Sequence, residues 1–242
     1  YGARKLASDL IKGGSEGDMV QTMQAITKWG KKACRSIGLE SPLQKQECDE
    51  ELLRIFGYLN DHFEHAPYLM GSMPCAADAS VLGGLLSHFL HDPAPKKRLS
   101  GFFHLIHWAR EQETRHVFQM DTFTTTTTTT TQPPLLPVYN DISSVPLVFH
   151  QMLSEMNKTL CPFVKANAKA LQAGNRSFVM ERYGETVSLR TRPTVEDSRR
   201  ALCLFLGKSL LDPLERAKFD QLLDTYPNIA AVYSPHEHCS KL

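Results

Sequence analysis

Apolar residues recur at helical spacing through the first half of the chain. These stripes predict helices over residues 18–38, 50–65 and 76–90, and a fourth helix after Gly101. The stripe of the second segment consists of Leu52, Phe56, Leu59 and Phe63. The stripe of the third consists of Ala79, Leu82, Leu86 and Phe89. An isolated helix of this length is marginal in water, so we expect these helices to pack against one another.

A break in composition follows the fourth helix. Residues Thr124 to Thr131 are eight consecutive threonines, and Gln132, Pro133 and Pro134 come next. A threonine run loses side-chain freedom in a helix and has little apolar surface to bury. We therefore predict a disordered linker over residues 119–145. An expanded codon repeat explains it better than a glycosylated stalk.

The pattern beyond the linker predicts more helices and one hairpin. A helix is expected from Pro146 to Gly174, kinked or divided at Pro162. Residues 178–190 form two short β-prone runs joined through a glycine, which is typical of a hairpin. Capping patterns at Thr194-x-x-Asp197 and Asp212-Pro213 predict two closing helices. The fold class is thus all-α: a bundle over residues 1–118, the linker, and a helical extension with a small hairpin over residues 146–242.

The charge balance argues against nucleic acid as a partner. There are 27 basic and 26 acidic residues, for a formal charge of +1. Lys96, Lys97 and Arg98 form the one small basic cluster, in a predicted loop after Pro95, and a solvated surface turn explains it.

The distribution of apolar residues and cysteines bears on location. No apolar run approaches the roughly 18 residues that span a bilayer, so no membrane partner is expected. The six cysteines are scattered without a C-x-x-C pair, which favours reduced thiols and a cytoplasmic location. The chain opens with neither Met nor the apolar block of a signal peptide. We therefore expect it to be the later part of a longer protein.

One segment carries a resemblance to a known family. The run Pro67-Tyr68-Leu69-Met70-Gly71-Ser72-Met73-Pro74-Cys75-Ala76-Ala77-Asp78-Ala79 resembles the stretch of glutathione S-transferases that leads into the central helix of their C-terminal domain. That pattern ends in Ser/Thr-x-x-Asp, a capping box that satisfies free N–H groups at a helix start. Cys75 replaces the Ser or Thr, and a thiol is a weak acceptor. We expect Asp78 to accept from the N–H of residue 75.

The resemblance extends to both sides. Upstream, the predicted helix with Leu52, Leu59 and Phe63 is similar to the preceding helix of that domain. Downstream, two segments are similar to segments of a bacterial-type subgroup of these transferases: the run from His88 to Pro95 and Trp108-Ala109-Arg110. That subgroup has a further helical extension, which residues 133–229 resemble loosely. The resemblance is strong over residues 50–110.

The resemblance implies both a fold and an activity. It implies a C-terminal helical domain whose thioredoxin-like partner domain, absent here, binds the co-substrate glutathione and supplies the activating residue. No catalytic residue is therefore assigned. It also implies a homodimer, a small electrophile as substrate, and an electrophile-side wall from the first helix. The candidates for this wall are Met19, Met23, Ile26 and Trp29. Core packing is the other interpretation of this stripe, and the pattern favours it.

Two alternatives lead to other classes of function. Isolated domains of this type also serve as non-enzymatic protein-interaction modules, since a bundle without its partner domain exposes an apolar face. Histidines also form pairs three residues apart, at 62/65, 88/91 and 104/107, and such spacing can hold a metal ion. No third ligand stands at an obvious position, so no metal site is assigned. The tail at residues 236–239 holds several types of ligand, but we expect the chain to fray there, and no metal site is assigned to it either.

Overall fold

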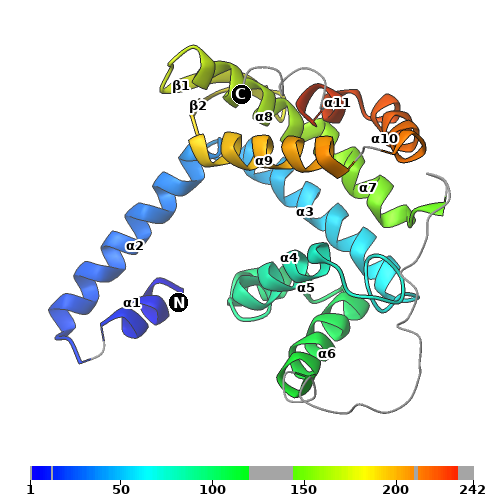
Figure 1. The fold of residues 1–242 in the computed structure, drawn as a ribbon. Coiled ribbons are helices and arrows are strands. Elements are labelled where there is room, and N and C mark those ends of the chain that lie inside the picture. Colours follow the sequence, from blue (N-terminus) through cyan, green and yellow to red (C-terminus); the bar gives the residue numbers. More distant parts are fainter. Residues whose placement is uncertain (1, 12, 120–143, 210–211, 234–242) are drawn as a thin grey trace. The chain divides into compact units, whose positions relative to one another are not determined.

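The computed structural model describes residues 2–11, 13–119, 144–209 and 212–233 (Figure 1). This part of the chain is mostly helical, with one two-stranded antiparallel sheet, which confirms a mostly helical chain with a small hairpin. Among the described helices, none is long and apolar enough to cross a membrane. The threonine run and nearly all of the predicted linker lie outside the described residues.

The elements follow one another in a simple order. The first half contains α1 (Gly2–Leu10), α2 (Glu16–Ser36), α3 (Pro42–Phe63), α4 (Ala76–Gly84), a π-helical turn η1 (Leu85–Phe89), α5 (Pro93–Leu99) and α6 (Phe103–Gln119). The second half contains α7 (Leu147–Glu155), a π-helical turn η3 (Met156–Leu160), α8 (Cys161–Gln172), β1 (Ser177–Arg182), β2 (Glu185–Arg190), α9 (Pro193–Ser209), α10 (Pro213–Thr225) and α11 (Pro227–Tyr233).

The chain divides into two compact units. Unit 1 comprises residues 1–51 and 152–242, and unit 2 comprises residues 52–151. These bounds differ from the predicted ranges 1–118 and 146–242. The reason is that β2 packs on α2, so the second half shares a unit with the first helices.

Unit 2 is built around the aromatic stripe of α3. Phe56, Leu59 and Phe63 are buried, as the spacing implies. The Phe63 ring stacks on Trp108 of α6 at 4.0 Å between centroids, and Phe56 meets Phe89 edge-on at 5.0 Å. These contacts join α3, η1 and α6 in one core.

Two details of unit 2 differ from the sequence prediction. The predicted helix over residues 76–90 changes to a π-helical turn after Gly84, which shifts the phase of its apolar face. Leu85 is therefore buried, whereas Leu86 is half-buried. Ala79, which precedes this turn, is exposed. The predicted loop after Pro95 is α5, with its exposed cations on the helix. Prolines are tolerated there because the first helical turn has no intrahelical partner for their missing N–H groups.

Helix α3 begins eight residues before the predicted start. The N–H of Gln44 donates to Ser41 Oγ at 3.1 Å, and the N–H of Ser41 donates to Gln44 Oε1 at 3.1 Å. This is a capping box with Pro42 at the first helical position. The apolar stripe starts only at Leu52, so periodicity alone places the start too late.

Unit 1 packs the hairpin and the closing helices on α8. Its core cluster consists of Cys161, Phe163, Val164, Val187, Leu189, Leu223, Tyr226, Ile229 and Val232. The hairpin is confirmed: Phe178 pairs with Leu189 and Met180 with Val187. Tyr183 and Gly184 both have positive φ, which suits the two-residue turn of a right-twisted hairpin.

Three features of unit 1 refine the prediction. The helix predicted over residues 146–174 continues through α7, the π-helical turn η3 and α8, and Pro162 lies in the first turn of α8, two residues after η3 ends. The stripe shifts accordingly: Leu160 is 41% exposed and Cys161 is fully buried. Helix α9 starts at Pro193 rather than Thr194, and the short helix α11 was not predicted.

Candidate functional site

The four residues predicted for a substrate wall all lie on α2, but no single site gathers them. Met19, Met23 and Ile26 are half-buried, and Trp29 is 68% exposed. None of the 21 residues of α2 is buried, so the helix does not enter a core along its length. Met23 lines one hollow and Trp29 lines another.

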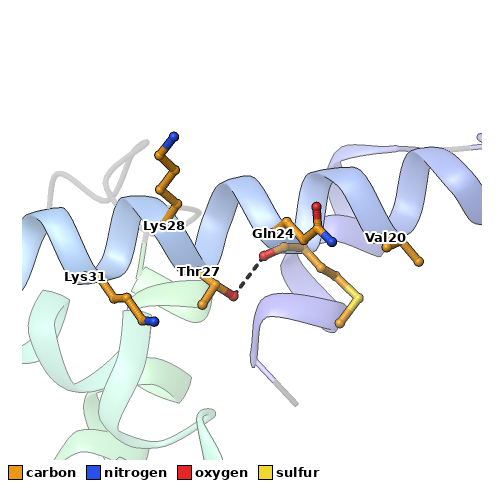
Figure 2. Close-up of a pocket in the computed structure, with 6 residues that line it drawn as sticks. Val20, Gln24, Thr27, Lys28 and Lys31 are labelled. Carbon is orange, nitrogen blue, oxygen red and sulfur yellow. Dashed lines mark hydrogen bonds between the residues drawn. The ribbon is translucent and has the colours of Figure 1, made fainter.

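The hollow beside Met23 runs along one face of α2 (Figure 2). Its volume is about 430 Å³, and its lining consists of Val20, Met23, Gln24, Thr27, Lys28 and Lys31. Thr27 Oγ1 donates to the Met23 carbonyl at 2.9 Å, so this hydroxyl is engaged within the helix. The described residues that line it all come from one helix, and among them there is no opposing wall of the kind that encloses a small ligand.

A larger groove lies between the end of α2 and the hairpin, and we call it the α2–hairpin groove. Its volume is about 770 Å³, within the range of small-molecule sites. Its lining consists of Trp29, Lys32, Ala33, Arg35, Ser36, Ile37, Ser177, Ser188, Leu189, Arg190 and Arg192. On α2 the small side chains of Ala33 and Ser36 follow Trp29 at helical spacing, which leaves room beside the indole.

Gly38 sets how closely the chain leaving α2 approaches the hairpin. It has a φ of +74°, a left-handed conformation that costs glycine little. A Cβ there would lie 3.2 Å from Leu189 Cδ2 and 3.4 Å from Val187 Cγ2. The hairpin therefore packs directly on this glycine, and the groove opens beside that contact.

Two arginines hold the carboxyl end of α2. Arg192 Nη2 donates to the Ser36 carbonyl at 3.1 Å and to Ser36 Oγ at 2.9 Å. Arg182 Nη1 donates to the Ile37 carbonyl at 3.1 Å. The last carbonyls of a helix lack intrahelical partners and carry partial negative charge, so cations suit this position. These bonds tie α2 to the hairpin across the groove.

A buried asparagine holds the backbone of Arg192 in place. Asn167 of α8 is fully buried, and its Oδ1 accepts from the Arg192 N–H at 2.7 Å. Its Nδ2 donates to the Arg192 carbonyl at 3.1 Å. Since one side chain satisfies both backbone groups, the residue that follows the hairpin has a fixed register.

The groove is lined by positive charge. Four cations line it, Lys32, Arg35, Arg190 and Arg192, and no Asp or Glu does so among the described residues. Arg35 Nε pairs with Glu40 Oε1 at 2.8 Å. In the part of the chain that the structure describes, Lys32 and Arg190 form no ion pair. The α2–hairpin groove is thus the candidate functional site.

Sequence reasoning singled out Trp29 of this site but missed its cations. Lys32 and Arg190 lie more than 150 positions apart in the chain. No local motif links them, and only the packing of β2 on α2 brings them to one groove.

A polar cluster behind the hairpin turn holds Tyr183. Its hydroxyl donates to Glu51 Oε2, and Thr159 Oγ1 donates to Glu51 Oε1 at 2.7 Å. Burial, together with the bond to Glu51, raises the pKa of Tyr183 above its ordinary value. Burial also raises the pKa of Cys48, which lies beside it. Cys48 is therefore held as a thiol, unlike the thiolates that act as nucleophiles.

A buried ion pair occupies the centre of the closing helices. Arg199 donates from Nη2 to Glu196 Oε1 at 2.7 Å and from Nε to Oε2 at 2.8 Å. Its Nη1 donates to the Val232 carbonyl at 3.1 Å. A cavity of about 240 Å³ adjoins this arginine. Because the guanidinium is already engaged with these acceptors, its role is to join α9 to α11.

The segment on which the family resemblance rests forms a compact turn. Asp78 is 5% exposed, and its carboxylate accepts from the Cys75 N–H at 2.7 Å and from the Leu69 N–H at 2.8 Å. The Cys75 side chain faces the N–H of Asp78, which completes the capping box. Desolvation raises the pKa of the Cys75 thiol.

The histidine pairs have ordinary partners. His62 Nε2 lies 2.9 Å from the Tyr68 carbonyl, and His88 Nδ1 lies 3.7 Å from Asp92 Oδ2. His107 Nδ1 lies 3.9 Å from Glu111 Oε2. Within the described ranges, no group of three or more His, Cys, Asp or Glu side chains is placed to hold a metal ion. The tail at residues 236–239 lies outside these ranges.

Comparison with known proteins adds no relative from which a function could be transferred. No family model, no curated protein and no solved structure matches this chain.

Proposed function

We propose that this chain is the C-terminal helical part of a glutathione S-transferase-like protein. In this role it contributes the electrophile-side wall of the substrate pocket, together with dimer contacts. The reaction of the whole protein is glutathione conjugation or thiol exchange, with a small electrophile as the second substrate and a cytoplasmic location. The observation that carries the proposal is the turn into α4, which bears the family-like sequence.

This turn gives a physical reason for the sequence pattern. Asp78 satisfies two backbone N–H groups that the turn leaves without other partners, at Leu69 and at Cys75. Trp108, which belongs to the same resemblance, donates its indole N–H to the Pro67 carbonyl at 2.9 Å. The residues that define the pattern therefore act on one another in unit 2. This supports the proposal at the level of the fold.

The chemistry divides between two domains. A glutathione thiolate attacks the electrophilic carbon, its sulfur forms the new bond, and the leaving group departs. Lowering the pKa of the thiol is the task of a thioredoxin-like domain outside these 242 residues. What α2 contributes is binding and orientation of the electrophile, for which Met19, Met23, Ile26 and Trp29 remain the candidates.

Calorimetric titration of glutathione tests the proposal. The titration is made with this chain and with a form extended upstream as far as the gene allows. We expect binding by the extended form alone, because the helical domain holds little of the glutathione site. If neither form binds glutathione, the transferase proposal is rejected.

A second candidate function is a protein-interaction module. It is favoured by the exposure of large apolar residues on the first two helices, where Leu10 is 66% exposed, Val20 50% and Trp29 68%. Exposed apolar side chains of this size offer contacts to another protein. Analytical ultracentrifugation of wild type and the Leu10→Glu/Val20→Glu variant distinguishes the cases for self-association. A dimer that the charges dissociate assigns self-association to these helices under either candidate function, whereas a wild-type monomer argues against a homodimer. The glutathione titration separates the two functions.

A further inference from the structure

We propose that the α2–hairpin groove binds a small organic anion that carries an aromatic ring, such as an aryl carboxylate. This goes beyond the proposed function, because it requires neither glutathione nor a second domain. The groove combines an aromatic surface, cations without ion-pair partners among the described residues, and a fixed frame.

The composition of the groove places an aromatic surface beside positive charge. The Trp29 side chain is 68% exposed, which is unusual for so large an apolar group. One helical turn further along α2, Lys32 reaches the same groove, and Arg190 reaches it from β2. An indole face stacks on an aromatic ring, while the cations bind a carboxylate.

The charge of the groove is not neutralised from within. Among the described residues that line it there is no carboxylate, and neither Lys32 nor Arg190 has an ion-pair partner in the described part of the chain. Arg192 donates to Ser36, a neutral residue, and so keeps its positive charge. Among the four cations, the charge of Arg35 alone is balanced by an ion pair, which it forms with Glu40. An anion is therefore the complementary occupant, whereas a neutral or cationic ligand leaves the charge unsatisfied.

The frame of the groove is set before a ligand arrives. The Arg182 and Arg192 bonds to the end of α2, with the contact of Gly38 against Leu189, hold α2 and β2 together. A preformed site loses little conformational entropy on binding. The volume of about 770 Å³ is that of a small-molecule pocket rather than a protein interface, so we assign a small molecule.

Nuclear magnetic resonance of the two tryptophan indole N–H groups tests the assignment. The probe is 2-naphthoate, and 2-naphthalenemethanol is its neutral counterpart with the same ring. We expect 2-naphthoate to shift the Trp29 signal along a saturating curve, with a Kd of about 1 mM or lower. The buried Trp108 indole, which lies in unit 2, serves as the internal reference. The Trp29→Phe variant assigns the two signals.

Charge variants show whether the cations are responsible. Lys32→Glu and Arg190→Glu are each expected to weaken 2-naphthoate about tenfold. Lys45→Glu is the matched control, because Lys45 is exposed and does not line the groove. Since all three positions are exposed, the variants should fold normally, and their amide spectra check this. With the wild-type chain, raising the salt concentration should weaken 2-naphthoate, because screening acts on exposed charges.

Three results would overturn the proposal. One is equal binding of the alcohol and the carboxylate. Another is an equal effect of Lys45→Glu and Arg190→Glu. The third is that the groove binds an acidic peptide but not 2-naphthoate, which would assign the site to a protein partner.

Discussion

At the scale of single residues, the buried carboxylate of Asp78 shows how one side chain determines a turn. Its two oxygens take one backbone N–H each, from Leu69 and from Cys75, and the side chain is almost fully buried. Leaving such N–H groups unpaired away from water costs about 1–3 kcal/mol each. The Asp is thus needed for the fold of unit 2 and is not free for chemistry.

Replacing Asp78 should destabilise unit 2. We expect Asp78→Ala to lower the free energy of unfolding by about 2–4 kcal/mol, because two N–H groups lose their acceptor. Urea unfolding followed by Trp108 fluorescence in a Trp29→Phe background measures this, since that indole lies in the same unit. Asp61→Ala is the control: Asp61 is exposed, so its loss should change the value by less than about 0.5 kcal/mol. Similar effects of both variants would refute the role assigned to Asp78.

Cysteine reactivity follows burial at the same scale. Cys34 is exposed, whereas Cys161 is fully buried and desolvation raises its pKa to about 11. The thiolate is the reactive form, so a buried thiol with a raised pKa is inert.

Alkylation with iodoacetamide at pH 8 should therefore modify Cys34 and spare Cys161 in the folded chain. In urea both should react, and peptide mass spectrometry reports the sites. Folding raises the pKa of Cys161 from 9.0 to about 11. The protonated thiol therefore contributes to the free energy of unfolding below pH 9.0, and this contribution is lost as pH rises towards 11. Rapid modification of Cys161 in the native chain at pH 8 would contradict its burial.

At the scale of elements, the packing of the hairpin on the end of α2 depends on a glycine. Gly38 and Gly174 each follow a helix with a positive φ, of +74° and +72°. They differ in their surroundings: a Cβ at Gly38 would press on Leu189 and Val187, while nothing lies within 4 Å of one at Gly174. A comparison of substitutions at the two positions therefore separates the energetic cost of backbone strain from that of packing.

The matched pair Gly38→Ala and Gly174→Ala measures the packing contribution. Gly174→Ala should cost about 1 kcal/mol, since only the left-handed backbone is strained. Gly38→Ala should lower the free energy of unfolding by about 1 kcal/mol or more beyond the effect of Gly174→Ala, because β2 has to move away from the new Cβ at position 38. Urea unfolding followed by far-ultraviolet circular dichroism provides both values. Equal costs would mean that the hairpin does not pack on Gly38.

A second link between elements is the buried pair of α9. Glu196 and Arg199 are each about 5% exposed, and Arg199 also donates to the Val232 carbonyl at the end of α11. Its hydrogen bonds with Arg199 lower the pKa of Glu196 below 4.5. The stability from this pair is thus present above pH 4.5 and is lost as pH falls through the folded pKa.

Removing one member of this pair leaves a buried charge. Glu196→Ala should therefore destabilise the chain by about 3 kcal/mol at pH 7, and the difference from wild type should shrink below pH 4.5. Glu113→Ala is the control. Glu113 pairs with Arg110 at the same spacing of three residues, but this pair is exposed on α6, so its loss should change stability little. Thermal unfolding at pH 7 and pH 4 compares them. A difference independent of pH would exclude ionised Glu196 as the cause.

At the scale of the whole molecule, the chain forms two units, and unit 1 draws on both ends of the sequence. Unit 1 contains α2, the hairpin and the closing helices, whereas unit 2 contains the segment that resembles the transferases. The candidate groove and the turn into α4 thus lie in different units, although Trp29 belongs both to the groove and to the proposed substrate wall. The Trp29 signal therefore reports on the groove and the Trp108 signal on unit 2.

The linker predicted over residues 119–145 stays a prediction. Limited digestion with proteinase K, which has broad specificity, tests it. We expect the first cuts within this range, because a threonine and proline run offers nothing to pack. First cuts inside α3 or α8, with residues 120–135 spared, would reject the linker.

Local signals in the sequence account for most of the elements. Helical spacing indicates the aromatic core of α3, a glycine between β-prone runs indicates the hairpin, and Asp212-Pro213 indicates the start of α10. Each signal arises within a few residues, where backbone geometry and capping act. The resemblance segment belongs with these, since Asp78 acts on residues nearby in the chain.

Other features required the tertiary structure. The π-helical turns shift the apolar faces after Gly84 and before Pro162, and short helices such as α5 and α11 lack a periodic signal. The cations of the groove come from segments more than 150 residues apart, so no spacing rule connects Lys32 with Arg190. By itself the sequence determined the kinds of element and much of the core stripe of unit 2, because these follow from local periodicity. The groove, its charge and the division into two units were decided by which helix the hairpin packs against, and long-range packing of this kind leaves no local pattern.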